Sequence, residues 1–459
     1  MELVLGIDLG TTNFKACVFG RDGRQRGLGR VAVRPDVSGD RCELPAERFW
    51  AHLREAVAAA LKEAGAADGE LSDIKAIGYS SQASSFILLD EHDVPLTPLI
   101  LWPDKRVRRI DPALAALWSR PDFTDTTGLG LQPGAEFTPA KLLWFRSRHH
   151  EVWARMRRIM TISDYLVYSL TGRAVGDAGT AALLGMQDVR RLAWWPAALE
   201  AIGVEPGQLS QPLRPGSLAG PITPKGAAIL GVPVGVPLAV GSLDHHAAAI
   251  GAGLDMLGEA SESTGTVTAC IRHADRCNPR PACTIGPGLR EGQYYELVFD
   301  ENGAGVLDWY QREHAPDLGI PELLRLAEKS PGAGGPVALP QADRYPGLDG
   351  FGGRSPSHGH GYYVRAILES TARTLGELLE RLCPGRRPAR IVATGGGARS
   401  DFWLQVHADG VRAEMVAVAS EEPACLGAAL MAAVVAGWFT DHAAAAACWV
   451  RARKVISPR

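Results

Sequence analysis

The residues with the clearest capacity for chemistry lie near the N-terminus, in the segment GIDLGTTNFK at residues 6–15. Asp8 ends an apolar run, a turn of small residues follows, and Lys15 opens the next apolar stretch. A polyphosphate needs the backbone amides and hydroxyls of such a turn, and its divalent cation needs a nearby carboxylate. The segment therefore predicts a phosphate-binding turn. The alternative is a plain β-hairpin in which the aspartate is incidental.

A second carboxylate, Asp244, stands in LAVGSLDHH at residues 238–246, after an apolar strand and a Gly/Ser turn. An aspartate at the start of a helix can simply cap it. It can also take a proton from a hydroxyl held in line with a phosphoryl group. Neighbouring His245 and His246 would point in different directions from a helix, which disfavours a metal site there.

Two more glycine turns could complete a nucleotide site. STGTV at residues 263–267 offers the same backbone amides as the first turn, without a carboxylate. TGGGA at residues 394–398 follows an apolar strand and would let a flat nucleobase approach the backbone closely. The alternative for this third turn is an ordinary connection from a strand to a capped helix.

Length and composition bound what can position these residues. A chain of 459 residues exceeds a single ordinary core, so we expect two domains. A hydrophobic fraction of 46% and a charged fraction of 22% are typical of a folded soluble protein, and the net charge of −3 offers no field for nucleic acid or membrane. Eight cysteines without a CxxC pair fit reduced thiols. With no signal peptide or membrane span expected, we predict a cytoplasmic protein.

The order of elements argues against two common nucleotide folds. Antiparallel strands are predicted before the first long helix, at about residues 45–64, and a further strand at 74–79, which is not a Rossmann pattern. The chain also lacks GxxxxGK[ST], which excludes a Walker-type loop. Residues 259–270 resemble residues 8–19 with the acid removed, which predicts two similar domains.

The domain boundary is predicted just beyond a Pro/Gly-rich connector at residues 205–237, giving domains 1–246 and 247–459. Residues 111–203 read as helical and rich in tryptophan. A final buried helix is expected within 424–439, with Ser420 as its cap and Glu421 and Glu422 favoured by the helix dipole.

Taken in order, these motifs resemble the FGGY carbohydrate kinases, of the superfamily that includes hexokinase, the heat-shock chaperones and actin. Four further segments carry the resemblance: PLILWPDKR (98–106), FTPAKLLWFR (137–146), SDYLVYSLTG (163–172) and EEPACLGAALMAAVVAG (421–437). The resemblance implies an α/β fold of two ribonuclease H-like (actin-like ATPase) domains facing a central cleft. It also implies ATP and Mg²⁺ as cofactors.

Individual roles follow from the resemblance by position. Asp244 aligns with the catalytic base, and Asp8 looks like the Mg-associated acid. The expected nucleotide contacts are Thr11, Thr12, Asn13 and Lys15 in the first loop, Gly265 and Thr266 in the second, and Gly395, Gly396, Gly397 and Ser400 at the adenosine.

The sugar pocket departs from two known patterns. Where glycerol kinases carry an Arg-Glu pair and xylulose kinases a Met-His pair, this chain has Ala83-Ser84, and Glu136 replaces a tyrosine of glycerol kinases. The candidate substrate contacts are Gln82, Ala83, Trp102, Asp104, Glu136 and His245. The stretch 343–363 is also atypical, and its role stays open.

The resulting hypothesis is ATP-dependent phosphorylation of a hydroxyl on a small sugar or polyol, xylulose or another ketose among them. The first domain would supply Asp8, Asp244 and the sugar pocket, and the second the remaining nucleotide contacts. The alternatives are a sugar sensor without turnover, which would not need both acids, and a chaperone-like ATPase, which needs a peptide-binding domain that we do not expect after Gly437. The sequence leaves the particular sugar open, and a homodimer is compatible with the resemblance.

Overall fold

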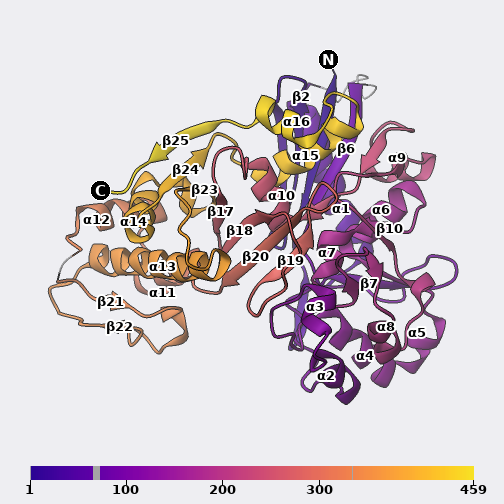
Figure 1. The fold of residues 1–459 in the computed structure, drawn as a ribbon, viewed down its shortest axis with the longest axis horizontal. Helices are drawn as coiled ribbons and strands as arrows, with labels where there is room; N and C mark the ends of the chain where they lie inside the picture. The colour runs from indigo at the N-terminus through magenta and orange to yellow at the C-terminus, as the bar shows by residue number, and fades with distance from the viewer. Residues whose placement is uncertain (1, 66–72, 333) are drawn as a thin grey trace. The chain divides into compact units, whose positions relative to one another are not determined.

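The computed structural model describes residues 2–65, 73–332 and 334–459, and the chain forms two compact units (Figure 1). Unit 1 comprises Met1–Gly251, Ala274–Tyr295 and Glu422–Trp449. Unit 2 comprises Ala252–His273, Glu296–Glu421 and Val450–Arg459. Each unit is built on its own twisted sheet.

The main sheet of unit 1 mixes parallel and antiparallel strands. Its order is β14 (Leu218–Pro221), β15 (Pro237–Ala239), β6 (Ile74–Ser81), β1 (Leu3–Leu9), β2 (Asn13–Gly20) and β3 (Gln25–Ala32), with β16 (Ser242–Leu243) pairing beside β6. β1 runs parallel to β6 and antiparallel to β2. This register sets Asp8 opposite Lys15 on one side and beside Ser80 on the other.

Glycines in the strands allow helices to approach both faces of this sheet. On one face, α1 (Ala46–Glu63) packs so closely that a Cβ on Gly29 would lie 1.8 Å from the carbonyl oxygen of Ala56. On the other face lies α15 (Pro423–Val435), where a Cβ on Gly78 would lie 2.0 Å from the carbonyl oxygen of Ala428. In Figure 1, α15 and α10 (Asp244–Gly251) lie beside the strands of the N-terminal half.

Unit 1 also carries a smaller layer with its own apolar cluster. Its strands form the order β4 (Asp36–Ser38), β5 (Arg41–Leu44), β8 (Leu99–Ile100), β7 (Phe86–Leu89), β9 (Arg158–Thr161). The helices of the segment predicted to be helical are α2 (Pro112–Trp118), α3 (Phe123–Thr127), α4 (Thr138–Arg148), α5 (His150–Arg155), α6 (Ile162–Thr171), α7 (Ala178–Ala182) and α8 (Pro196–Ile202). The remaining elements of this unit are α9 (Pro224–Leu230), α16 (His442–Trp449), β19 (Thr284–Pro287) and the short pairs β10 (Val175–Asp177) with β13 (Gln211–Leu213) and β11 (Gln187–Asp188) with β12 (Ala193–Trp194).

Unit 2 repeats the strand order of unit 1. Its strands run β20 (Tyr294–Asp300), β18 (Thr268–Ala274), β17 (Ala260–Thr264), β23 (Arg390–Gly395), β24 (Glu414–Val418) and β25 (Ala452–Ile456), and β18 and β20 cross the limits between the units. The other elements are α11 (Ala304–His314), α12 (Ile320–Lys329), α13 (His360–Leu382), α14 (Asp401–Val411), β21 (Val337–Ala338) and β22 (Phe351–Gly352). Tyr310, Phe351 and Trp403 belong to its buried core.

Six strands of one sheet correspond to six strands of the other, whereas the seventh strands, β16 beside β6 and β19 beside β20, differ in place. β17 is parallel to β23 and antiparallel to β18, as β1 is parallel to β6 and antiparallel to β2. In each unit an antiparallel strand closes the parallel side, β14 beside β15 and β25 beside β24. The topology confirms both the α/β prediction and the internal repeat between residues 8–19 and 259–270.

Two expectations about chain organisation differ from the structure. The compact units are not divided by a single cut after His246, because residues 422–449 return to unit 1, where α15 packs on β1 and β6. The ranges 1–246 and 247–459 remain a prediction for the functional domains. Ser420 does not cap the last buried helix. α15 begins at Pro423 with Glu422 at its cap position, where the glutamate side chain forms ion pairs instead.

Candidate active site

Three strand ends meet at one edge of the unit 1 sheet and bring both predicted acids there. Asp8 lies near the end of β1, Ser80 near the end of β6, and Asp244 directly after β16. The carboxyl ends of parallel strands are the usual place for a ligand site in an α/β sheet. Asp8 is 5% exposed, and its Oδ1 accepts a hydrogen bond of 2.9 Å from the Ser80 hydroxyl.

Asp8 is a buried carboxylate whose charged neighbours include Lys15, Asp244 and Glu422. Burial raises the pKa of Asp8, the Lys15 ammonium lowers it, and the negative charge of Asp244 raises it again, with a net rise. The two carboxylates therefore interact electrostatically. Among the described residues, no group of three or more metal-ligating side chains occurs, so a cation here would take most of its ligands from phosphate oxygens and water.

Lys15 is held by a second carboxylate from the far end of the chain, which sequence reasoning did not assign to the site. Its Nζ lies 3.4 Å from Oδ2 of Asp8 and 2.8 Å from Oε2 of Glu422. Glu422 is 4% exposed and also forms an ion pair with Arg30 of β3. Burial lowers the pKa of Lys15, but Asp8 and Glu422 raise it more, so the ammonium is retained. The start of α15 thus anchors the base of the first turn.

Asp244 opens α10 and stays partly exposed. Its Oδ1 accepts a 2.7 Å hydrogen bond from the backbone amide of His245, which leaves Oδ2 for a ligand. The ring of His246 is buried and lies 4.8 Å from that of Tyr295, whereas His245 is partly exposed. The two histidines face different surroundings, as the helical spacing predicts.

Gln82, Ser85 and Trp102 form what we call the acceptor wall, after the proposed sugar acceptor. A closed ring of hydrogen bonds links this wall to the first turn. The indole Nε1 of Trp102 donates to Oγ1 of Thr11 (2.8 Å), and the Trp102 amide donates to Oγ of Ser85 (2.9 Å). Ser85 donates to Oε1 of Gln82 (3.0 Å), whose Nε2 donates to the carbonyl of Gly10 (3.2 Å). Gln82 and Trp102 thus lie together beside the turn, with Trp102 exposed and Gln82 buried.

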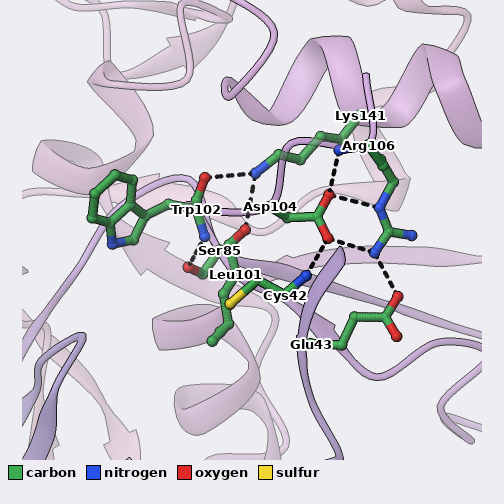
Figure 2. A network of polar contacts seen from close by, with 8 residues as sticks. All are labelled: Cys42, Glu43, Ser85, Leu101, Trp102, Asp104, Arg106 and Lys141. Atoms are coloured by element: carbon green, nitrogen blue, oxygen red, sulfur yellow. Dashed lines mark hydrogen bonds and ion pairs between the residues drawn. The ribbon is translucent and has the colours of Figure 1, made fainter. Parts of the chain in front are cut away.

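Asp104 lies behind this wall rather than on its surface (Figure 2). It is fully buried and accepts hydrogen bonds from the backbone amide of Cys42 (2.7 Å) and from the Arg106 guanidinium. Burial raises the pKa of Asp104, but the Arg106 and Cys42 donors lower it below its ordinary value. A sugar contact by Asp104 would require one of these bonds to break. Glu136, by contrast, is exposed just before α4.

The remaining predicted residues of unit 1 line the same region. Thr12 is exposed at the tip of the first turn, and its carbonyl accepts from the amide of Val33 (2.8 Å), while Asn13 pairs with Ala32. Ala83 is half-buried beside Ser84, whose φ of 56° lies in the left-handed region. The side chains of Ala83 and Ser84 are smaller than those of an Arg-Glu or a Met-His pair.

In unit 2 the two glycine turns are adjacent. β17 and β23 are parallel with Thr264 beside Gly395, so the turn with Gly265 and Thr266 lies next to the turn with Gly395, Gly396 and Gly397. Gly395 has φ 80°, and a Cβ there would lie 2.7 Å from the Thr264 carbonyl oxygen. The Ser400 hydroxyl caps α14 by accepting from the Trp403 amide (3.2 Å).

A buried acid supports these turns from below. Thr264 Oγ1 donates to Glu262 (2.7 Å), and burial raises the pKa of Glu262 to about 8. Burial also lowers the pKa of His407 to about 3, and its Nε2 accepts from the indole of Trp403 (3.1 Å). A neutral acid and a neutral imidazole therefore underlie the turn.

Known structures share this architecture. The chain superposes on the xyloylose kinase of Brucella ovis with a TM-score of 0.87 at 26% identity, over 100% of this chain and 95% of that one. The two repeated sheets, each with its glycine turns at the carboxyl edge, define a two-domain α/β kinase of the actin-like ATPase fold.

The family is equally clear. Residues 3–251 match the N-terminal domain of the FGGY family of carbohydrate kinases, and residues 306–436 match its C-terminal domain. The chain belongs to this family. It is 29% identical to the gluconokinase of Bacillus licheniformis over 95% of this chain and 88% of that protein. It is 25% identical to the xylulose kinase of Bacillus subtilis strain 168 over 100% of this chain and 93% of that protein.

The predicted class of activity is therefore confirmed: the chain is a carbohydrate kinase, a phosphotransferase with an alcohol group as acceptor. In the part of the chain that the structure describes, none of the helices has the length and apolar character needed to span a membrane.

Proposed function

We propose that this kinase transfers the γ-phosphoryl group of ATP to a hydroxyl of an open-chain sugar or sugar acid, with Asp244 as general base. The observation that carries the proposal is the approach of Asp8 and Asp244 at one sheet edge, beside a turn whose lysine is held by Glu422. The relatives named gluconokinase and xylulose kinase support this acceptor class.

The proposed nucleotide contacts divide between the units. In unit 1, Lys15 and the amides and hydroxyls of Thr11, Thr12 and Asn13 would bind phosphate oxygens. In unit 2, Gly265 and Thr266 would bind phosphate. The adenosine would be contacted by Gly395, Gly396, Gly397 and Ser400. The open backbone at Gly396, where an added Cβ would meet no atom closer than 3.9 Å, fits a flat base.

The surroundings of Asp8 fit a hard divalent cation, because this buried carboxylate shares the sheet edge with the carboxylate of Asp244, and oxygen ligands of this kind are the ones that such a cation prefers. Mg²⁺ held near Asp8 would neutralise charge on the phosphates. Asp244, with Oδ2 free of the His245 amide, would accept the proton of the acceptor hydroxyl. Trp102, Gln82, Ala83, Glu136 and His245 would orient the acceptor and exclude water from the transfer.

A coupled assay of ADP release over gluconate, xylulose, ribulose and glycerol tests the proposal. We expect turnover that depends on an acceptor, with gluconate or a ketopentose at least about tenfold better in kcat/KM than glycerol, because the Ala83-Ser84 pair lacks the charged grip on a triol. ADP release that is equal with and without every acceptor would contradict it.

A further inference from the structure

Lys141 lies beside the acceptor wall of unit 1, and the proposed chemistry assigns it no role (Figure 2). It belongs to α4 and is fully buried, which is rare for lysine. Its Nζ donates to the carbonyl oxygens of Leu101 (2.9 Å) and Trp102 (3.0 Å), which are neutral acceptors. A buried ammonium normally faces a carboxylate, so this arrangement is costly for stability alone.

The charged groups around Lys141 do not supply a dedicated partner. Asp104 is the strongest attraction, but its oxygens are engaged by Arg106, whose own charge repels the ammonium. Glu136 is exposed, and the Cys42 thiol adds a weaker attraction. Burial dominates and lowers the pKa of Lys141 to about 8. Arg106 in turn pairs with Glu43 at 2.5 Å and lies over the ring of Trp144.

The carbonyls that Lys141 binds belong to the peptide segment that presents Trp102. That residue joins the circuit of Gly10, Thr11, Gln82 and Ser85 described above, so its backbone position fixes where the indole meets the first turn. Three separate elements of the wall thus converge on one residue: Lys141 binds the carbonyl of Trp102, Ser85 binds its amide, and Thr11 binds its indole.

We infer that Lys141 is a positioning residue, whose ammonium holds the Trp102 segment so that the acceptor wall and the phosphate-binding turn keep one fixed geometry. This inference rests on the proposed function for its kinetic consequence. Small displacements between reacting groups cost large factors in rate, so loss of the ammonium reduces transfer without removing any group that touches substrate.

The test compares Lys141→Met with Trp102→Phe and with Lys105→Met, a change at an exposed lysine of the segment that contains Trp102. We expect Lys141→Met to lower kcat/KM for the acceptor by about 10- to 100-fold while the KM for ATP changes less than about threefold. Lys105→Met should match the wild type. Because Lys141 acts through Trp102, the effects of Lys141→Met and Trp102→Phe should not add. The variant with both changes should have an acceptor kcat/KM within about threefold of that of the less active single variant.

The pH profile separates positioning from a merely structural role. As Lys141 loses its proton above about pH 8, its neutral amine binds the two carbonyls more weakly, so the ratio of wild type to Lys141→Met in acceptor kcat/KM should shrink by pH 9.5. A ratio that stays constant from pH 6.5 to 9.5, or a Lys141→Met enzyme with wild-type kinetics, would overturn the inference.

Stability provides a second discriminating readout. Because the folded pKa lies below the unfolded one, the unfolded chain binds more protons between about pH 8 and 10.5, and the contribution of Lys141 to stability rises with pH there. Removing a charge that destabilises the fold at pH 7 should leave the midpoint of urea unfolding unchanged or higher in Lys141→Met. A lower midpoint together with a uniform loss of kcat and ATP binding would indicate a structural role and contradict positioning.

A third readout needs neither turnover nor a folded Lys141→Met variant. The fluorescence difference between wild type and Trp102→Phe should change with a midpoint near pH 8, because the neutral amine binds the carbonyls of Leu101 and Trp102 more weakly than the ammonium does. The absence of any transition between pH 7 and 10.5 would overturn the inference. Absence of kinase activity with every acceptor would instead contradict the proposed function, while the fluorescence still decides the role of Lys141.

Discussion

Glu422 receives two cations at the base of the first turn, Lys15 from β2 and Arg30 from β3. It is almost fully buried, so each ion pair is poorly screened by solvent. The carboxylate therefore sets the direction in which the Lys15 ammonium points toward Asp8. In the proposed function, this direction decides how well the turn binds phosphate.

Glu422→Gln removes that charge while keeping the side-chain shape. We expect the KM for ATP to rise about tenfold and the free energy of unfolding to fall by about 1–3 kcal/mol, because two cations lose their buried partner. Steady-state kinetics and urea unfolding measure the two effects. The exposed neighbour provides the control, since Glu421→Gln should leave both unchanged. A Glu422→Gln enzyme with wild-type KM for ATP would show that Lys15 needs no such anchor.

At the scale of residues, the sequence predicts the acids that end strands but not their partners. Asp8 and Asp244 are recognisable because each follows an apolar strand and precedes a small-residue turn or helix. The pairing of Glu422 with Lys15 depends on packing between opposite ends of the chain, for which local pattern carries no signal. Lys141 sits in a segment that resembles the family, but a helical lysine is ordinarily expected in solvent.

At the scale of elements, α15 positions both the central strands of the unit 1 sheet and α10. It packs on β1 and β6 through Gly6 and Gly78, and it packs on α10 through Gly251 and Gly427. A Cβ on Gly427 would lie 2.0 Å from the carbonyl oxygen of Ala247. Backbone contacts this close cannot yield as a flexible side chain would, so the small residues of PACLGAALMAAVV are required for the helix to reach the sheet.

Gly78→Ala tests this packing. The added methyl meets the carbonyl of Ala428 on a backbone that cannot move freely, and we expect the free energy of unfolding to fall by about 2–3 kcal/mol. The matched control is Gly376→Ala in the middle of α13, where the added Cβ meets no atom within 4 Å. There alanine should raise stability by about 0.5–1 kcal/mol, because glycine is a poor helix former. Urea unfolding that ranks the two variants equally would contradict the packing argument.

Long elements were predictable and short ones were not. The sequence predicts the helix found at Ala46–Glu63 and the strand found at Ile74–Ser81, because their apolar periodicity extends over several turns or pairs. It predicts the final buried helix within 424–439 but not β24, which the structure places between α14 and that helix. Strands of two to five residues such as β8 and β24 are stabilised by neighbours in the sheet, so local pattern is too short to reveal them.

At the scale of the whole molecule, each unit repeats one sheet topology and hosts a different share of the proposed site. Unit 1 holds charged groups at its carboxyl edge, whereas unit 2 offers glycine backbone above a neutral acid, Glu262. The repeat could be read from residues 8–19 and 259–270. The return of residues 422–449 to unit 1 could not be predicted in this way. A linker in the sequence shows where the chain can be divided, but it does not show which unit a later segment packs against.

The buried acid of unit 2 makes stability depend on pH. Glu262 keeps its proton to about pH 8 in the folded state, whereas the unfolded chain releases it from about pH 4.5, so this group's stabilisation is lost as pH rises across that window. Relative to Glu262→Gln, which has no proton to lose, the wild type should lose up to about 1.4 kcal/mol per pH unit between pH 6 and 8. Urea unfolding of both proteins measures the difference, with Glu377→Gln on the exposed face of α13 as control. Parallel curves for wild type and Glu262→Gln would contradict a neutral Glu262.

The most direct test of the central claim is the single-turnover rate of Asp244→Asn with ATP and its best acceptor, compared with Asp111→Asn. Asp111 caps α2 by accepting from the Ala113 amide at 2.9 Å, a role that asparagine fills equally well. If Asp244 is the general base, Asp244→Asn should transfer phosphate at least about 100-fold more slowly while binding ATP as the wild type does, and Asp111→Asn should be fully active. Transfer by Asp244→Asn within about threefold of the wild-type rate would contradict the account.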